Sequence, residues 1–428
     1  MPSGCSGVKL NVLTLGCPKN QADTNRLLGA AAGRDIEFVV DPSSADVIMV
    51  NTCGFIEEAK RESIDEILSL ASLKKKDQKL LVFGCLAKRY AEELRAELPE
   101  VDAFFGVDAD EAMLSYIGAG ARPTGEYGPS LEGLALRHTA PLKVADGCDR
   151  GCTFCVIPSI RGSFVSRDPN EILSDAETLL KNGARELMLV AQDLTNYDYR
   201  GYLLKDLIRD LAGLEGEHWV RPMYYYPTMI DTSLLETMAS CSSVCRYVDM
   251  PVQHSANRIL RAMGRAGGRK DYLDKVNLIR SIMPDAALRT SVIVGFPGET
   301  DDEFEEMLSF LEEARFDWVG AFRYSPEDGT PAASMAGQVE EDIKESRIDD
   351  LMEKQADISA ELNQRHVGRE MRALVDEVEV DRSIARTEHQ APDIDGMTIV
   401  NAPGLVAGQF IDIRITASHE FDLEADPL

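Results

Sequence analysis

Three cysteines close together in the chain constrain its fold and chemistry more than any other feature. They lie in the run Cys148-Asp149-Arg150-Gly151-Cys152-Thr153-Phe154-Cys155, which is a C-x3-C-x2-C pattern. A four-iron cluster is held by cysteine thiolates, and a cluster with three protein ligands keeps one iron open to another molecule. A structural zinc site is normally closed by four ligands, usually in C-x2-C pairs. The pattern favours an iron–sulfur cluster with an open position; the alternatives are ordinary thiols or a zinc site completed from afar.

The residues before this loop read as a short strand. Residues 142–146, Leu-Lys-Val-Ala-Asp, would deliver the cysteines to the carboxyl end of the strand. In β/α barrels, functional sites are built at that end of the strands. We therefore expect this run to be the first strand of such a barrel.

A second set of cysteines follows three strand-like apolar runs near the start of the chain. Helical patterns separate these runs, so we expect parallel strands joined by right-handed crossovers. Parallel strands place their carboxyl ends on one edge of the sheet, where open α/β folds build their sites. One such cysteine would be read as a small buried hydrophobe, but three in successive units are expected to converge: Cys17 after residues 10–15, Cys53 after residues 47–50 and Cys85 after residues 80–83.

Length and charge narrow the class of protein. With 428 residues and 44% hydrophobic residues, the chain is long enough for two or three domains with sizeable cores. Its net charge of −28 disfavours a nucleic-acid substrate, since phosphate contacts dominate such affinity. We see no apolar run approaching the roughly 20 residues of a membrane span and no signal peptide, so we expect a cytoplasmic protein. Nine cysteines in such a chain indicate metal or redox use.

The chain divides into three expected domains of α/β class with a linker. We expect a parallel α/β sheet domain over residues 8–120, a Pro- and Gly-rich linker over residues 121–135, an open, partial β/α barrel over residues 136–366 and a small antiparallel β-barrel over residues 367–428. Further barrel strands are predicted at residues 186–190, 219–226, 246–250, 288–294 and 318–324. Asp168-Pro169 and the Thr300/Glu303 capping box are expected to begin helices. In the last domain, strands are predicted at residues 371–375, 397–400 and 410–415.

Several segments together resemble the methylthiotransferase family of radical S-adenosylmethionine (SAM) enzymes, in particular its RimO-type members, over essentially the whole chain. The matching stretches are Leu15-Gly16-Cys17-Pro18-Lys19-Asn20, residues 50–56 (VNTCGFI), Gly84-Cys85-Leu86, residues 152–162 (CTFCVIPSIRG), residues 294–300 (VGFPGET) and, in the last domain, residues 391–396 (APDIDG). The resemblance implies that the last domain is of the TRAM type. It also implies two [4Fe-4S] clusters, one held by Cys148, Cys152 and Cys155, which binds SAM, and one held by Cys17, Cys53 and Cys85, which carries the sulfur to be transferred.

The resemblance further implies which residues face SAM. Expected contacts lie beside the cluster loop and after the second, fourth and fifth barrel strands, and no catalytic side chain is expected beyond the cluster ligands. Gly295 would allow close backbone approach to a ligand. Arg161 and Arg289 would pair with a carboxylate or with cluster charge, or form plain salt bridges, and His254 is equally well a structural residue. The expected cofactor contacts are Phe154, Gln192, Gln253, Ser255, Arg289, Val292, Gly295 and Phe296.

The implied activity is insertion of a methylthio group at the β-carbon of an aspartate of small-subunit ribosomal protein S12, with a one-electron donor such as flavodoxin or ferredoxin. A tRNA adenosine methylthiotransferase of the MiaB type is the nearest alternative, and a non-enzymatic metal-binding scaffold is another. Residues 368–428 contain five basic and 13 acidic residues, which would repel RNA. We expect this acidic barrel to dock a basic protein, with Asp376, Glu377, Glu379 and Asp381 on one strand face. Cys5, Cys241 and Cys245 are expected to be spectators.

Overall fold

The structure, a computed structural model, describes residues 7–32, 34–119 and 138–428. The expected linker over residues 121–135 and Cys5 lie outside these residues. The described residues form two compact units: those within residues 7–119, 146–149 and 156–165 make the first, and residues 138–145, 150–155 and 166–428 make the second. The segment around the C-x3-C-x2-C loop therefore contributes to both units, and each unit is described by itself.

The first unit contains a five-stranded parallel sheet of order β2-β1-β3-β4-β5. This order reverses direction between β1 and β3, and open α/β sheets bind ligands at such a switch point, beyond the carboxyl ends of the strands. The expected parallel sheet is confirmed. Its strands are β1 (Val8–Thr14), β2 (Ile36–Phe38), β3 (Val47–Thr52), β4 (Lys79–Gly84) and β5 (Ala103–Phe104).

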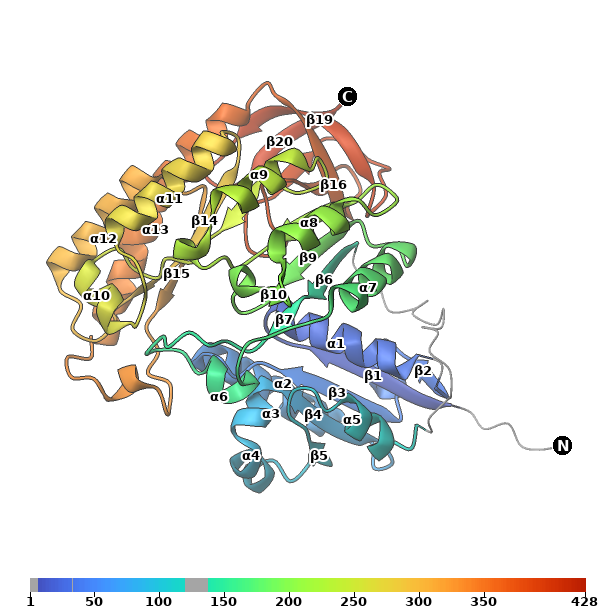
Figure 1. Ribbon diagram of the computed structural model, residues 1–428. Helices are drawn as coiled ribbons and strands as arrows, with labels where there is room; N and C mark the ends of the chain where they lie inside the picture. Colours follow the sequence, from blue (N-terminus) through green and yellow to red (C-terminus); the bar gives the residue numbers. More distant parts are fainter. Residues whose placement is uncertain (1–6, 33, 120–137) are drawn as a thin grey trace. The chain divides into compact units, whose positions relative to one another are not determined.

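Helices cover both faces of this sheet (Figure 1). The central strand β3 is buried along its whole length, so its side chains feed two apolar cores, one on each face. Leu27 and Met113, from α1 and α5, join one core, while Ile67 and Leu94, from α2 and α4, join the other. The helices are α1 (Pro18–Ala31), α2 (Glu57–Leu73), α3 (Cys85–Arg89), α4 (Ala91–Glu97), α5 (Asp110–Tyr116) and α6 (Ile157–Arg161), with a 3-10 turn η1 (Pro42–Ser44).

The second unit contains two three-stranded parallel sheets, of orders β12-β9-β6 and β13-β14-β15. A parallel bridge between Val220 of β12 and Val244, just before β13, continues one sheet into the other, so six parallel strands form one open array with β6 and β15 at its edges. The expected partial barrel is confirmed. Its strands are β6 (Thr139–Lys143), β9 (Glu186–Val190), β12 (Trp219–Pro222), β13 (Tyr247–Asp249), β14 (Ala287–Val294) and β15 (Trp318–Arg323).

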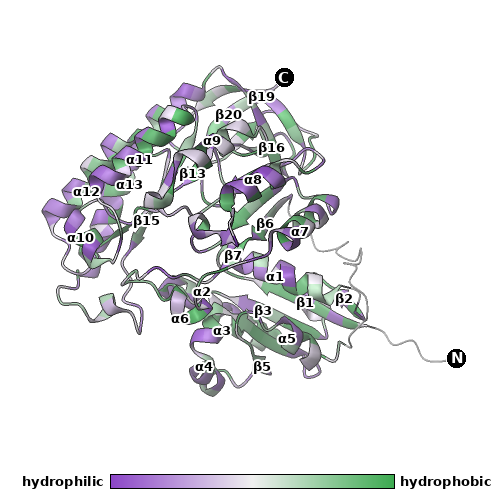
Figure 2. Ribbon diagram, viewed as in Figure 1, coloured by the Kyte–Doolittle hydropathy of each residue, from purple (hydrophilic) through white to green (hydrophobic). Residues whose placement is uncertain are grey.

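Helices follow the barrel strands and turn their apolar sides to them (Figure 2). They are α7 (Pro169–Lys181), α8 (Leu204–Ala212), α9 (Thr232–Ser240), α10 (Asn257–Ala262), α11 (Arg269–Ile282), α12 (Asp301–Ala314) and α13 (Glu341–Asn363), with 3-10 turns η2 (Leu194–Asn196), η3 (Pro227–Met229), η4 (Pro331–Ser334) and η5 (Gln364–His366). Both predicted caps are confirmed. The Asp168 side chain accepts from Asn170 N, and Thr300 forms a capping box with Glu303.

The strand expected over residues 142–146 is shifted. The barrel strand is β6, which ends at Lys143, and Ala145–Asp146 forms a separate short strand β7 that pairs with β8 (Val165–Ser166). A second short pair joins β10 (Asp198–Tyr199) to β11 (Tyr202–Leu203). The apolar run spans both β6 and β7, so hydrophobicity alone did not show where the pairing partner changes.

The last part of the second unit is a closed five-stranded barrel of order β16-β17-β18-β20-β19. Closure leaves none of its strands with an unpaired edge, and its interior is apolar. The expected small barrel is confirmed, but it is not wholly antiparallel, because β18 and β20 pair in parallel. The strands β17 and β20 add to those predicted. The strands are β16 (Glu370–Val378), β17 (Ser383–Thr387), β18 (Thr398–Val400), β19 (Phe410–Ser418) and β20 (Leu423–Pro427).

The expectation that four acids of β16 and its turn share one exposed face is wrong for Asp376. A bulge between Val375 and Glu377 interrupts the alternation of the strand. The Asp376 carboxylate instead contacts His138 at 2.6 Å and Arg386 at 2.7 Å. Glu377, Glu379 and Asp381 remain exposed. Over residues 7–32, 34–119 and 138–428, none of the helices combines the length and apolar character that crossing a membrane requires.

Candidate cofactor-binding sites

Three strand ends of the first unit bring Cys17, Cys53 and Cys85 to the switch-point edge of the sheet. Cys17 lies at the amino end of α1, Cys53 directly follows β3, and Cys85 begins α3 directly after β4. Burial, and then the neighbouring thiols of Cys17 and Cys85, raise the pKa of Cys53 to about 12. The triad is therefore gathered within one unit, as the pattern of runs predicted.

Two glycines make this gathering possible. Gly16 has a φ of 86°, and a Cβ there would lie 2.5 Å from Cys53 Cβ. A Cβ on Gly54 would lie 2.7 Å from Leu86 Cα, next to Cys85. Real Cβ atoms do not approach other atoms this closely, so only glycine lets the three loops come together. Gly16 and Gly54 thus allow the loops that carry the three cysteines to pack closely.

The spacing of the three thiols fits a cluster better than a zinc ion. Within the described part of the chain, the sulfur atoms of Cys17, Cys53 and Cys85 do not all lie within 4.8 Å of one another. Tetrahedral zinc with Zn–S bonds of about 2.3 Å would need sulfur atoms about 3.8 Å apart. Since at least one of these sulfur–sulfur distances exceeds 4.8 Å, the triad suits a four-iron cluster with one iron left open.

The guanidinium of Arg161, at the end of α6, forms a hydrogen bond with one thiol of this triad. Its Nη2 donates to Cys85 Sγ at 3.3 Å and to Asp23 at 2.8 Å, and its Nη1 donates to Asp146 at 3.2 Å. Burial raises the pKa of Cys85 against the opposing charge of Arg161. Although burial alone would lower it, the charges of Asp23, Cys85 and Asp146 raise the pKa of Arg161, so the guanidinium stays protonated. The triad thus faces a permanent positive charge.

The C-x3-C-x2-C loop is held by backbone hydrogen bonds within each unit. In the first unit, Cys148 N donates to Gly162 O at 3.1 Å. In the second, Cys155 N donates to Cys152 O at 3.2 Å, and Thr153 N donates to Met263 O at 2.9 Å, just after α10. Phe154 packs on an apolar cluster that includes Phe296. The three cysteines remain partly exposed.

Most of the expected SAM contacts lie just beyond the carboxyl ends of strands of the second unit. Gln192 follows β9, Gln253 and Ser255 follow β13, and Gly295 and Phe296 follow β14. Gln253 adopts a φ of 71°. Its backbone N–H donates to Ser291 O, and the residue forms an isolated parallel β-bridge with Val292. Positive φ in a non-glycine residue is costly and concentrates at functional sites. Ser255 Oγ is buried without a hydrogen-bond partner among the described residues, which leaves it available to a ligand.

The close neighbour of Gly295 is a side chain of the protein, whereas a ligand was expected there. A Cβ at this position would lie 2.3 Å from Lys344 Cγ, so the glycine makes room for a lysine of α13. Its N–H donates to Glu299 Oε2 at 2.7 Å, and Arg347 donates to Glu299 Oε1 at 2.9 Å. The expected close approach at Gly295 is therefore made by the protein's own helix.

His254 is a structural residue. Its Nδ1 accepts backbone hydrogen bonds from Ser255 N at 3.0 Å and Ala256 N at 2.9 Å. The proton must then reside on Nε2, which faces Glu299 at 3.6 Å. The buried ring therefore shapes the turn that carries Gln253 and Ser255.

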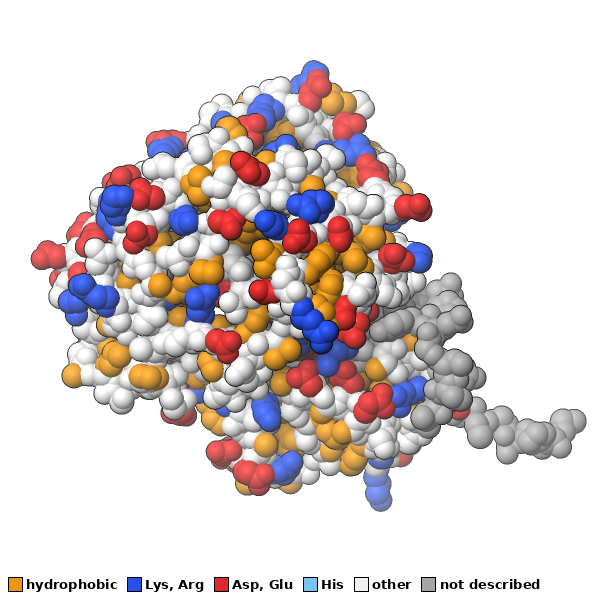
Figure 3. All heavy atoms as spheres, in the orientation of Figure 1, with side chains coloured by type: hydrophobic (Ala, Val, Ile, Leu, Met, Phe, Trp, Pro, Cys, Tyr) orange, Lys and Arg blue, Asp and Glu red, His pale blue; other side chains and the backbone are white. Residues whose placement is uncertain are grey.

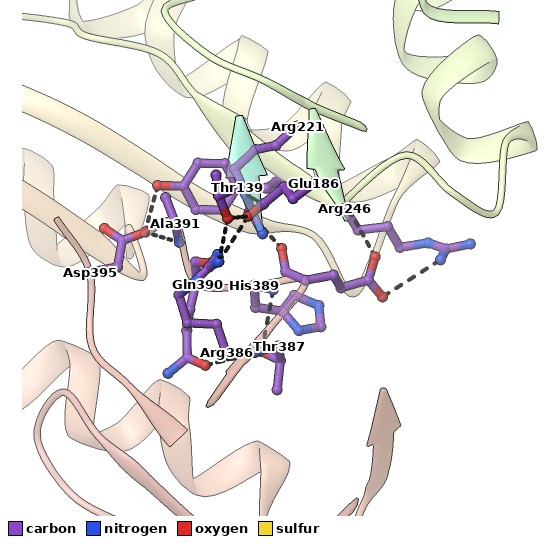
Figure 4. A network of polar contacts seen from close by, with 12 residues as sticks. Thr139, Glu186, Arg221, Arg246, Arg386, Thr387, His389, Gln390, Ala391 and Asp395 are labelled. Atoms are coloured by element: carbon purple, nitrogen blue, oxygen red, sulfur yellow. Dashed lines mark hydrogen bonds and ion pairs between the residues drawn. The ribbon is translucent and has the colours of Figure 1, made fainter. Parts of the chain in front are cut away.

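Arg289 does not reach the carboxyl end of its strand. It is the third residue of β14, and its guanidinium contacts Asp249 at 3.1 Å and Asp395 at 3.3 Å. Asp395 and the ion pairs of Glu186 with Arg221 and Arg386 join the barrel strands to the C-terminal barrel, and Figure 4 shows this part of the network. Arg289 thus forms the salt bridges that were left open as an alternative, and its role as a cofactor contact stays a prediction.

Sequence reasoning missed a group of residues around Cys152. Arg265 Nη1 lies 3.9 Å from Cys152 Sγ, and Arg150 donates to Asp193 at 2.8 Å. The guanidinium groups of Arg150 and Arg265 lie 4.0 and 4.3 Å from the centroid of the Tyr226 ring. Such stacking is favourable for arginine. Arg150 stands inside the cysteine motif, but Arg265 and Tyr226 are far from it in sequence and no spacing rule connects them.

The remaining cysteines of the described chain lie at and just after the end of α9. Cys245 is buried, and burial raises its thiol pKa well above the ordinary value. Cys241 is partly exposed beside Ser240. The interpretation of both as spectators stays a prediction.

Known proteins resemble this chain over nearly its whole length. Residues 9–106 match a family described as Uncharacterized protein family UPF0004, residues 142–311 the Radical SAM superfamily and residues 367–428 the TRAM domain. The ribosomal protein uS12 methylthiotransferase RimO of Thermodesulfovibrio yellowstonii is 44% identical over 96% of this chain and 98% of that protein. The corresponding protein of Thermotoga maritima is 42% identical over 97% and 99%. The chain belongs to the RimO methylthiotransferase family.

Solved structures extend the likeness of this RimO-family chain to the fold. The radical S-adenosylmethionine methyltransferase TsrM from Kitasatospora setae, with tryptophan and a SAM analogue bound, has a TM-score of 0.56 at 14% identity, over 88% of this chain and 78% of that one. The cobalamin-dependent radical SAM enzyme OxsB has a TM-score of 0.54 at 13% identity, over 81% and 56%. At these identities the likeness shows a common architecture only.

Proposed function

We propose that this protein is a radical SAM methylthiotransferase that adds a methylthio group to the β-carbon of an aspartate of ribosomal protein uS12. The observation that carries the proposal is the presence of two separate cysteine triads, one gathered at the switch-point edge of the first unit and one in the C-x3-C-x2-C loop. Each offers the three thiolates that one four-iron cluster needs. Identity of 44% to a RimO methylthiotransferase over nearly the whole chain supports the substrate.

Two sets of residues would hold the cofactors. Cys148, Cys152 and Cys155 would ligate the cluster that binds SAM, and Cys17, Cys53 and Cys85 would ligate the cluster that carries sulfur. When bound, these groups supply reductive cleavage of SAM and the sulfur for transfer, and the protein supplies position and exclusion of water.

The chain's own residues would orient SAM and keep its surroundings dry. Gln192, Gln253 and Ser255 offer polar groups just beyond the carboxyl ends of β9 and β13. Val292 and Phe296 are fully buried and would exclude water from one side of SAM. Phe154 packs against the group of apolar side chains that contains Phe296. Arg265 is positioned to donate to Cys152, which lowers the electron density on that ligand.

The acidic C-terminal barrel would receive the substrate. On the face shown in Figure 3, acidic and basic side chains are interspersed. Glu377, Glu379 and Asp381 gather at the exposed end of β16 and its turn, where they would steer a basic protein. A one-electron donor such as flavodoxin or ferredoxin, a cytoplasmic location and no direct nucleic-acid binding complete the proposal.

The deciding experiment offers both candidate substrates to anaerobically reconstituted enzyme with SAM and a reductant. We expect mass spectrometry to find the methylthio mass on an aspartate of uS12 and no modified adenosine in tRNA. Modification of tRNA alone would replace the proposal with the MiaB-type activity. Reconstituted protein that fails to bind SAM in equilibrium dialysis would favour a metal-binding scaffold.

A further inference from the structure

Arg161 occupies a position that the proposed chemistry does not by itself explain. It is the last residue of α6, and its side chain is only 2% exposed. Its guanidinium is surrounded by groups from three other segments of the first unit: Asn20 and Asp23 of α1, Cys85 of α3 and Asp146 of β7. A buried cation with this many acceptors is fixed in both place and orientation.

Asp146 and Arg161 lie on either side of the C-x3-C-x2-C loop in the sequence. Asp146 precedes Cys148 by two residues, and Arg161 follows Cys155 by six, so the pair closes the segment that contains the C-x3-C-x2-C loop. The same closure is made in the backbone, where Cys148 N donates to Gly162 O at 3.1 Å. The Nη2 of Arg161 meanwhile donates to Cys85, a ligand of the other triad. One guanidinium therefore bonds to both cysteine-bearing segments.

We propose that Arg161 is a positioning residue that sets the reduction potential of the cluster at Cys17, Cys53 and Cys85 and ties it to the segment that carries Cys148. The inference rests on the proposed function, because it requires a cluster on that triad. It goes further by assigning one side chain to the control of that cluster's charge.

The physical basis is a charge-assisted hydrogen bond to a ligand sulfur in a buried place. Hydrogen bonds to cluster sulfurs and nearby positive charge favour the reduced, more negative cluster and so raise its potential. The effect is large where water is excluded, because the effective dielectric constant is low. The planar fork of arginine can serve Asp146, Asp23 and Cys85 together, whereas lysine offers a single point charge. The negative charge of Asp23 has the opposite effect, since it disfavours the more negative reduced cluster and so lowers the reduction potential.

The test measures the potential of the N-terminal cluster alone. The parent is the full chain with Cys148, Cys152 and Cys155 replaced by Ala, reconstituted anaerobically and titrated with the reduced signal followed by electron paramagnetic resonance. We expect Arg161→Gln to shift the midpoint potential downward, Arg161→Lys to shift it downward by less, and Asp23→Asn to shift it upward. Arg34→Gln is the matched control, since Arg34 bonds to Glu111 and to backbone carbonyls. It should leave the potential unchanged.

The measured potentials and iron contents distinguish a role in tuning the cluster from a purely structural role of Arg161. Equal potentials in the parent and in Arg161→Gln, with iron content unchanged, overturn the inference and leave the proposed function intact. A parent that binds no iron at this triad overturns both. If Arg161→Gln does not retain iron, the opposite shifts of Arg161→Lys and Asp23→Asn still support the role, and shifts of the same sign reject it. A purely structural arginine would alter stability in all of these variants without this order of potentials.

Discussion

Arg386 of the C-terminal barrel donates to Glu186 at the start of β9 at 2.9 Å, with the side chains only 4% and 0% exposed. Arg221 of β12 donates to the same carboxylate, and Tyr247 of β13 donates to Asp395 at 2.6 Å. Glu186 and Tyr247 are the first residues of β9 and β13, whereas the expected SAM contacts follow the carboxyl ends of these strands. The C-terminal barrel is thus joined to the opposite end of the strands from the chemistry.

Breaking this network at its centre should destabilise the second unit strongly. Glu186→Gln would leave Arg221 and Arg386 without their shared carboxylate, and removing one partner of a buried ion pair costs about 3–5 kcal/mol. Chemical denaturation should report this loss. Lys270→Gln is the control, because Lys270 pairs with Asp274 on the surface and such pairs contribute less than about 1 kcal/mol. Equal effects of the two changes would contradict the assignment.

Two buried histidines should make the protein lose stability on acidification. Burial lowers the pKa of His389 and of His366 to about 3, and their rings lie 5.2 Å apart. The unfolded chain takes up these protons near pH 6.5, so their contribution is complete above that value and falls as the pH drops towards 3. Thermal unfolding across this window should show the decline. His389→Gln should flatten it, and an unchanged slope would show that other groups cause it.

The two cysteine triads should load iron independently. Replacing Cys148, Cys152 and Cys155 with Ala should leave about four irons per chain and abolish cleavage of SAM, because one four-iron cluster would remain. Iron analysis and product chromatography measure the two effects. Loss of all iron from this variant would show that the triads depend on each other.

The complementary variant separates the roles of the two triads. With Cys17, Cys53 and Cys85 replaced by Ala, the protein should still cleave SAM when reduced but should form no methylthio product, since the proposed sulfur carrier is gone. Chromatography of 5'-deoxyadenosine and mass spectrometry of uS12 follow the two reactions. Normal methylthio product from this variant would show that sulfur comes from elsewhere.

Substrate docking should depend on exposed acids and not on Asp376. Changing Glu377 and Glu379 to Gln and Asp381 to Asn should weaken binding of uS12 and flatten its salt dependence, because fewer charges remain to be screened. Titration of uS12 at two salt concentrations checks this. Asp376→Asn should instead lower stability, since Asp376 pairs with Arg386 and His138. Unaltered affinity of the triple variant at low salt would reject docking at this surface.

Local patterns predicted the parts of the structure that local rules control. The caps at Asp168 and Thr300, strand β9 and the gathering of Cys17, Cys53 and Cys85 follow from periodicity, capping and the geometry of parallel sheets. The bulge at Asp376 and the partner of Arg289 could not be predicted, because both depend on which strands of distant sequence meet. Asn20 could have been predicted to lie near the site, since it follows Cys17 by three residues on a helix, and Asp23 follows Asn20 by another three.

The long helix α13 joins the carboxyl-end side of β14 and β15 to the C-terminal barrel. Near its start, Lys344 and Arg347 contact Tyr324 and Glu299, beyond the carboxyl ends of β15 and β14, and near its end Asn363 donates to His419 and Glu420 of the C-terminal barrel. At about 1.5 Å per residue, the separation from Arg347 to Asn363 is about 24 Å. A docked protein would bridge that span with an extended segment of about seven residues, at about 3.4 Å each. If uS12 docks on the C-terminal barrel as proposed, its modified aspartate would have to lie on a segment that can extend over such a distance, as a protruding loop can.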